Sequence, residues 1–243
     1  MHTPHATSRK EETMKVQSPG LQFYVDKLLK DEPFSFARYG NGEWDCILQL
    51  YHKTRSGSQK FSPGLRKALI ASLKTQRAGE YYTALQSTTF LKRIKLFHRL
   101  EKWVDENAQG LNWHEGEVFT RASRKSQLFP LIEAMKQHRV VVVGPKWLMK
   151  LPFASVFVPV RSRNCWQDAN AIMAQLRSLR NVVISFSAGP ATKVLIHRLQ
   201  PIIGKHSWLI DFGSLWDPFC GKNSRRYHSR ITPAVQRKNL MGK

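Results

Sequence analysis

The chain alternates β-branched or aromatic runs with stretches of helical periodicity, and this alternation limits the possible folds more than any other feature of the sequence. The clearest run, Arg139–Val143, holds four consecutive valines and ends at Gly144-Pro145-Lys146. A strand that is apolar on both faces is typical of the interior of a parallel sheet. Further strands are expected at Phe34–Arg38, Tyr81–Leu85, Ser155–Val160, Asn181–Phe186 and Trp208–Asp211.

Apolar residues at helical spacing fill the intervals between these strands. The expected helices are Leu21–Leu29, Glu43–Tyr51, Leu65–Leu73, Ser87–Val104, Leu128–Gln137, Trp166–Leu179 and Ala191–Leu199. The alternation indicates an α/β fold with a Rossmann-like, mostly parallel sheet flanked by helices. We expect a flexible N-terminal tail (1–18), one folded domain (19–220) and a basic C-terminal tail (221–243).

The chain is strongly basic, with a formal net charge of +22 over 243 residues. From Ala134 to Lys243, 18 Lys and Arg residues face only three acids, which gives 18 − 3 = +15. Such a field concentrates polyanions, so nucleic acid, DNA above all, is the leading partner class. A solvated basic face or an acidic protein partner are the alternatives. Two of the three acids, Asp211 and Asp217, fall in one short loop-like stretch and therefore stand out.

Several other classes of protein are disfavoured. The longest uncharged apolar run, Val140–Val143, is far too short to span a bilayer. Residues Met1–His5 lack the apolar core of a secretory signal. Three scattered cysteines form no zinc pattern and no disulfide framework. We expect a cytoplasmic protein without a transmembrane segment, in the host cytoplasm if the source is viral. The sequence does not indicate an oligomeric state.

Ligands of open α/β sheets bind beyond the carboxyl ends of the strands, and one such loop is the segment Arg38–Glu43. Gly40 and Gly42 let the backbone approach a ligand closely. Arg38 can hold a phosphate with two N–H groups. Alternatively, Glu43 only caps the following helix and pairs with Arg38. The segment is neither a dinucleotide-binding glycine fingerprint nor a P-loop.

Two further loops are candidates for phosphate binding. Ser187–Thr192 follows a strand and opens a helix, where backbone N–H groups and the positive helix end suit an anion. The alternative is an ordinary turn with a proline at the helix start. Lys146 ends the loop after the valine strand.

The last loop, Asp211–Phe219, carries the candidate bases. Asp211 ends a strand and Asp217 precedes a proline, so either carboxylate is a general base or a ligand for Mg²⁺ or Mn²⁺. Turn chemistry is the alternative for Asp217. Residues able to hold a diphosphate or an acceptor follow at Arg225, Arg226 and His228. The cluster His114-Glu115-x-Glu117 matches no standard metal spacing.

The segment Phe36-Ala37-Arg38-Tyr39-Gly40-Asn41-Gly42-Glu43 resembles the arginine–aromatic–glycine–aspartate–glycine–glutamate signature of the GT-D-fold glycosyltransferases. The Ser187–Thr192 turn is similar to a later glycine-containing loop of that family. Asp211-Phe212-Gly213 is similar to the end of its late strand. The resemblance covers about residues 30–220.

This resemblance implies a GT-D fold and transfer of a sugar from a nucleotide sugar, most simply a UDP-sugar, often with Mn²⁺ or Mg²⁺. The family's aspartate-x-glutamate pair is associated with the metal and the diphosphate. Glu43 keeps the glutamate position, whereas Asn41 stands at the aspartate position and offers an uncharged oxygen. The family's usual histidine after the late glycine is Ser214 here.

We therefore expect a nucleotide-sugar-dependent glycosyltransferase. The donor would be bound by Arg38, Gly40, Asn41, Gly42, Lys146, Ser187, Gly189 and Thr192. Glu43 and Asn41 would hold a divalent cation, and Asp217 or Asp211 would act as the base. The basic surface suggests a polyanionic acceptor such as a hydroxymethylated base in DNA, flipped out of the duplex. The alternatives are a glycosyltransferase acting on a surface glycan or protein, a non-enzymatic nucleic-acid-binding α/β module, and a methyl-donor transferase.

Overall fold

The computed structural model describes residues 14–75 and 79–242. Within these residues seven strands form one sheet with the order β3-β2-β1-β7-β6-β4-β5, and every neighbouring pair is parallel. The strands are β1 (Ser35–Tyr39), β2 (Tyr81–Leu85), β3 (Trp113–Glu115), β4 (Arg139–Pro145), β5 (Val156–Val160), β6 (Val182–Phe186) and β7 (Trp208–Asp211). The predicted α/β fold with a mostly parallel sheet is therefore confirmed.

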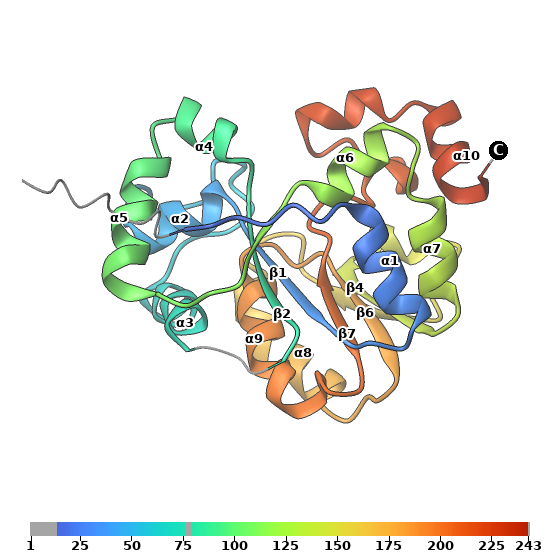
Figure 1. Cartoon of the computed structure of the whole chain (residues 1–243), viewed down its shortest axis with the longest axis horizontal. Coiled ribbons are helices and arrows are strands. Elements are labelled where there is room, and N and C mark those ends of the chain that lie inside the picture. The colour runs from blue at the N-terminus through green and yellow to red at the C-terminus, as the bar shows by residue number, and fades with distance from the viewer. Residues whose placement is uncertain (1–13, 76–78, 243) are drawn as a thin grey trace, which may run out of the picture.

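Helices cover both faces of this sheet (Figure 1). The helices α3 (Pro63–Lys74), α8 (Ala169–Leu176) and α9 (Ala191–Ile203) lie on one face, and α1 (Leu21–Leu29), α6 (Val118–Arg124) and α7 (Phe129–Lys136) lie on the other. The remaining helices are α2 (Asn41–Ile47), α4 (Thr88–Arg93), α5 (Phe97–Asn107) and α10 (Pro233–Met241), with short 3₁₀ turns at Lys146–Lys150, Cys165–Asp168, Pro218–Cys220 and Arg226–Arg230.

The valine strand shows how the sheet divides the core. Side chains alternate between the two faces of a strand. Val141 and Val143 pack with the α8–α9 side, and Val140 and Val142 pack with the α1–α7 side. All four are fully buried. This double burial is the reason that the run carries no polar residue, as expected for a central parallel strand.

Three parts of the fold differ from the prediction. The expected helix Ser87–Val104 is two helices, α4 and α5, because the backbone reverses at Lys95, where φ is +57°. The short strand β3 and the helix α6 were not predicted. At three residues, β3 is too short to show a periodicity, and it pairs along only one side with another named strand, β2.

The segments expected to be tails contain ordered structure where the structure describes them. Residues 1–13 lie outside the described residues, but Met14 is buried and Gln17 exchanges two backbone hydrogen bonds with β3, each 2.8 Å long. At the other end, α10 packs on α6 and α7. Its buried Asn239 accepts a hydrogen bond from the Leu128 N–H and donates one to the Ser123 carbonyl, both at 2.8 Å. The basic segment 221–242 is therefore a docked element and not a free tail.

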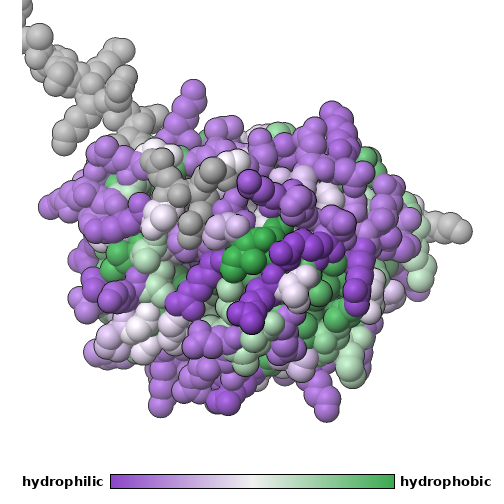
Figure 2. Space-filling model, turned by 90° about the horizontal axis from the view of Figure 1, so that it is seen from below, coloured by the Kyte–Doolittle hydropathy of each residue, from purple (hydrophilic) through white to green (hydrophobic). Residues whose placement is uncertain are grey.

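The surface is mostly polar. Hydrophilic residues cover most of the face shown in Figure 2, with a smaller hydrophobic area near its centre. Among the described residues, the helices are too short or too polar to cross a membrane.

Candidate functional site

Three of the loops singled out in the sequence meet at one place. The strands β1, β7 and β6 are adjacent and parallel, so the loops that follow them leave the same edge of the sheet. Parallel sheets place ligand sites at this carboxyl edge. The loop after β1 leads into α2, the loop after β6 leads into α9, and the loop after β7 begins at Asp211.

A buried lysine joins these three loops. Lys193, in the first turn of α9, is only 3% exposed. Its Nζ lies 2.8 Å from Glu43 Oε1, 2.9 Å from Asp211 Oδ2 and 3.2 Å from the Gly189 carbonyl oxygen. An ammonium group has three protons, and here it has three acceptors. Burial disfavours the charged amine, but the carboxylates of Asp211 and Glu43 outweigh it and hold the pKa of Lys193 above its ordinary value.

Glu43 acts as part of this buried cluster. It is the third residue of α2, and its Oε2 accepts a hydrogen bond of 2.8 Å from the Gly40 N–H, which caps the helix. Burial favours the neutral acid, but the ammonium of Lys193, this N–H and the Arg38 guanidinium together lower the pKa of Glu43. Glu43 is therefore an ionised side chain whose two oxygens are both engaged. The capping alternative is confirmed, whereas the expected partner Arg38 pairs with another acid.

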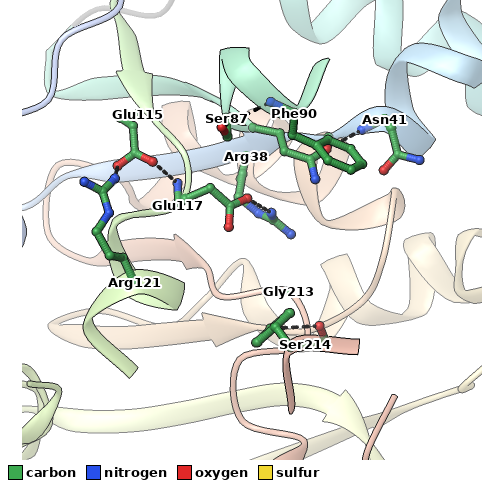
Figure 3. A network of polar contacts seen from close by, with 12 residues as sticks. Arg38, Asn41, Ser87, Phe90, Glu115, Glu117, Arg121, Gly213 and Ser214 are labelled. Carbon is green, nitrogen blue, oxygen red and sulfur yellow. Dashed lines mark hydrogen bonds and ion pairs between the residues drawn. The ribbon is translucent and has the colours of Figure 1, made fainter. Parts of the chain in front are cut away.

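That other acid is Glu117. The Arg38 guanidinium donates to Glu117 Oε1 at 3.1 Å, and the pair is partly open to solvent. Burial opposes the charge, but Glu117, Asp211 and Glu43 raise the pKa of Arg38. Figure 3 shows Arg38 and Glu117 between the Asn41 loop and the loop of Gly213 and Ser214.

The neighbouring glycine leaves room for this guanidinium. Gly213 has φ +57°, and a Cβ there would lie 2.9 Å from the Arg38 Nη2. On the other side, the Glu117 N–H donates to Glu115 Oε1 at 2.9 Å, and Glu115 also pairs with Arg121. Arg38 and Glu117 thus form the accessible part of the site, above the buried Lys193 cluster.

The glycine-rich turn Gly40–Gly42 is held by β2. The Asn41 N–H donates to the Gln86 side-chain oxygen at 2.9 Å, and Gly42 lies in the first turn of α2. The amide group of Asn41 forms no side-chain hydrogen bond within residues 14–75 and 79–242, and it is not a partner of Glu43.

The loop after β6 is anchored from both ends. The Ser187 N–H donates to the Val143 carbonyl at 2.8 Å, and the buried Thr192 hydroxyl accepts from the Ala188 N–H at 3.1 Å. The Ser187 hydroxyl is also buried, but it has no hydrogen-bond partner among residues 14–75 and 79–242. Ser187 and Gly189 line a small cavity of about 40 Å³, together with Arg161 and Ser162. Lys146 is exposed on the adjoining 3₁₀ turn.

Neither expected base is free. Asp211 Oδ2 accepts from Lys193 and, at 3.3 Å, from the Arg38 N–H, and Oδ1 accepts from the Gly213 N–H at 2.9 Å. Asp217 is 5% exposed. Its oxygens accept from the Trp147 indole at 2.9 Å and from the Ser224 hydroxyl. Asp217 thus ties the C-terminal segment to the turn after β4, which is a positioning role.

The residues expected to hold an acceptor divide into two kinds. Arg225 and Arg226 are exposed. His228 is buried, which lowers its pKa, and its Nδ1 accepts a hydrogen bond of 3.1 Å from the Ser224 N–H. The ring of His228 is therefore part of the local packing, unlike the two exposed arginines.

The cation site expected at Glu43 and Asn41 does not fit the residues present. Both Glu43 oxygens accept from N–H groups, and the nearest second carboxylate, Asp211, is bridged to Glu43 by the Lys193 ammonium. Within the part of the chain that the structure describes, no group of three or more His, Cys, Asp and Glu side chains is arranged for a metal ion.

Sequence reasoning missed Lys193 and gave Glu117 no role in this site. One signal for Lys193 was present, since a cation at the start of a helix is unfavourable to the helix dipole and indicates acids nearby. The identity of those acids was not accessible, because Glu43 lies 150 residues earlier in the chain and Asp211 lies on another strand.

The whole fold is similar to that of three solved structures, although no family model and no curated protein matches the chain. One is a domain of unknown function 1792, with a TM-score of 0.65 and 15% identity, covering 84% of this chain and 80% of that chain. Another, from Streptococcus sanguinis, is described as a new glycosyltransferase and has a TM-score of 0.63, 18% identity and 84% coverage of both chains. A third, described as having a distinct glycosyltransferase fold, has a TM-score of 0.63 and 16% identity over 93% of this chain and 90% of that chain.

Proposed function

We propose that this protein is a nucleotide-sugar-dependent glycosyltransferase. The observation that carries the proposal is the position of the Arg38–Glu43 motif. It lies at the central carboxyl edge of a sheet whose fold matches, over nearly its full length, structures described as glycosyltransferases. A likeness at this level of identity supports the fold, and the residues at the edge supply the chemistry.

The donor diphosphate binds between the loops after β1 and β6 in this proposal. Arg38 offers the N–H groups that are not taken by Glu117, and Ser187 offers a buried hydroxyl that has no hydrogen-bond partner in the described part of the chain. The first turn of α9 adds the positive end of a 13-residue helix. Lys146 is exposed at the adjoining turn and adds a positive charge there. These groups stabilise the negative charge that develops on the leaving diphosphate when its bond to the sugar breaks.

Glu117 is the base that fits the geometry best. Among the side chains of the described residues, only Arg38 bonds to the carboxylate of Glu117, through Oε1, which leaves Oε2 available. An acceptor hydroxyl beside Glu117 loses its proton to Oε2 as its oxygen attacks the anomeric carbon of the sugar. The Arg38 pair then fixes Glu117 next to the donor phosphate.

The acceptor in this proposal is a polyanion, such as DNA carrying hydroxymethylated bases, and the support is the net charge of +22. The exposed Arg225 and Arg226 lie in the segment that Asp217 and Ser224 tie down near the site. A glycan or protein acceptor is the second candidate, because the same cations suit its acidic groups.

The first test is a thermal shift. UDP or another nucleoside diphosphate at 100 times its Kd stabilises a folded protein by about 2.7 kcal/mol, a rise of several degrees in Tm. Arg38→Ala should lower the affinity for the nucleoside diphosphate by at least about tenfold, since one good charge-assisted contact is worth about 1.4 kcal/mol or more. The Tm shift at the same ligand concentration should therefore be smaller. Arg177→Ala is the matched control, because Arg177 is exposed just before β6, at the opposite edge of the sheet.

The second test is mass spectrometry of acceptors after incubation with a panel of sugar nucleotides. Hydroxymethylated DNA that gains a hexose or pentose mass supports the DNA acceptor, and a glycan or protein that gains it supports the second candidate. Binding of DNA without turnover of any nucleotide sugar would indicate that the protein is a non-enzymatic nucleic-acid-binding module. A Tm shift with S-adenosylmethionine instead of nucleotides would indicate a methyltransferase.

A further inference from the structure

The carboxylates at the sheet edge surround a position that a cation fills, and that cation is part of the chain. Glu43 Oε1, Asp211 Oδ2 and the Gly189 carbonyl converge on one point from three loops. Two carboxylates and a carbonyl are the hard oxygen ligands that Mg²⁺ and Mn²⁺ prefer. Here they lie 2.8, 2.9 and 3.2 Å from Lys193 Nζ, which are hydrogen-bond distances to an ammonium group.

The two carboxylates of the cluster have cationic partners without a metal ion. Glu43 and Asp211 contribute two negative charges. Lys193 supplies one positive charge at hydrogen-bond distance from both. Arg38, whose direct ion-pair partner is Glu117, also interacts electrostatically with both carboxylates. A divalent ion at the same point would need to displace the ammonium first.

The lysine is held too firmly to leave. Lys193 and the other residues of Ala191–His197 in α9 are all buried, so an ion that takes this position must displace a buried ammonium group. Each of its three protons has an acceptor. Moving it away would leave a buried charge without a partner, which proteins avoid.

We propose that Lys193 takes the place of a divalent cation in this site, so that the protein binds a nucleoside diphosphate and transfers sugar independently of divalent metal ions. The metal-independence of binding and transfer rests on the proposed glycosyltransferase function, whereas the filled cation position does not. The positive charge near the leaving diphosphate is then permanent, because it is supplied by the buried Lys193 and by the partly exposed Arg38.

Manganese titration followed by electron paramagnetic resonance tests the filled position without any nucleotide. The wild-type protein should bind no Mn²⁺ at this position at submillimolar concentration. Lys193→Ala opens the space between Glu43 and Asp211 and should bind one Mn²⁺ at least tenfold more tightly. The double variant Lys193→Ala/Glu43→Gln should lose that binding again. Stoichiometric binding by wild type that Glu43→Gln abolishes would overturn the proposal.

Calorimetry of UDP binding to wild type keeps the proposal testable if the Lys193 variants do not fold. The UDP affinity should be the same, within twofold, in EDTA and in 1 mM Mn²⁺ or Mg²⁺. A tenfold or greater loss of affinity in EDTA would refute the metal-independence and leave the glycosyltransferase proposal intact. If no nucleoside diphosphate binds under any condition, the proposed function is wrong, and the proposed metal-independent binding is wrong as well. The Mn²⁺ titration still decides whether Lys193 fills the cation position.

Discussion

Single residues decide the chemistry of this site, and only some of them were accessible from the sequence. The motif placed Arg38, Gly40 and Glu43 correctly at the sheet edge, because a strand followed by glycines and a helix start is a local pattern. Lys193 and its ion pair with Asp211 were missed, since the partners come from distant segments. Local patterns position a side chain on an element, but the pairing of charges depends on the strand order.

Replacement of Glu117 tests the proposed base. Glu117→Gln keeps the size of the side chain and its bond to Arg38 but removes the proton acceptor, so kcat should fall by about 10²–10⁴. UDP affinity should change little. The measurement is a steady-state rate with the acceptor identified by mass spectrometry. Glu133→Gln, a change at a half-buried residue of α7 whose carboxylate pairs with Lys136, is the control. An unchanged kcat in Glu117→Gln would assign the base elsewhere.

A second prediction at this scale concerns pH. His114 is buried, bonds the Tyr24 hydroxyl at 2.7 Å and stacks on Tyr82, and burial lowers its pKa to about 4. The unfolded chain takes up this proton near pH 6.5 and the folded protein only near pH 4. Stability should therefore fall as the pH drops from about 6.5 to 4, by an amount on the order of 3 kcal/mol.

Urea unfolding of His114→Phe measures this contribution. The variant should lose most of the decline between pH 6.5 and 4, whereas His98→Phe, at an exposed imidazole, should keep it. Equal pH dependence of wild type and His114→Phe would show that other groups cause the acid sensitivity.

At the scale of elements, the sequence predicted what is periodic and failed where an element is short or interrupted. The strands β2 and β7 and the helix α1 have the bounds that the pattern indicates. The strand β3 is too short to show a pattern, and α10 docks through the single buried side chain of Asn239. The expected long helix breaks because Lys95 adopts a left-handed backbone, which no propensity of lysine foretells.

Lys95→Gly should stabilise the protein. A non-glycine residue in the left-handed region is strained by about 1 kcal/mol, and glycine removes this strain at the end of α4. We expect a gain of about 0.5–1 kcal/mol in the free energy of unfolding, measured with urea. Lys102→Gly, in the interior of α5 at an exposed position, should instead cost about 1 kcal/mol. A loss of stability in Lys95→Gly would show that the reversal depends on the lysine side chain.

At the scale of the whole molecule, excess positive charge is the dominant property, and the sequence alone revealed it. The structure adds that the last segment, which carries six exposed cations, is fixed to the body by α10 and by the bond between Asp217 and Ser224. The basic surface is therefore preorganised, and its exposed cations are Lys222, Arg225, Arg226, Arg230, Arg237 and Lys238.

Binding of a 20-base-pair DNA should weaken steeply with salt. Changing Arg225, Arg226 and Arg230 together to Gln should flatten the plot of log affinity against log salt by about one unit per lost phosphate contact. The same change at three exposed lysines outside this segment, Lys67, Lys74 and Lys205, should alter the slope less. Equal effects of both triple variants, measured by fluorescence anisotropy, would mean that the charge acts without a defined binding face.

The strand order also has a consequence for biosynthesis. The strand β7 lies between β1 and β6, and among the described strands it joins the half of the sheet made by β1–β3 to the half made by β4–β6. A chain still emerging from the ribosome therefore holds two unjoined half-sheets, each with an open edge, until residues 208–211 are released. Such late, non-local closure slows folding and exposes strand edges in the nascent chain.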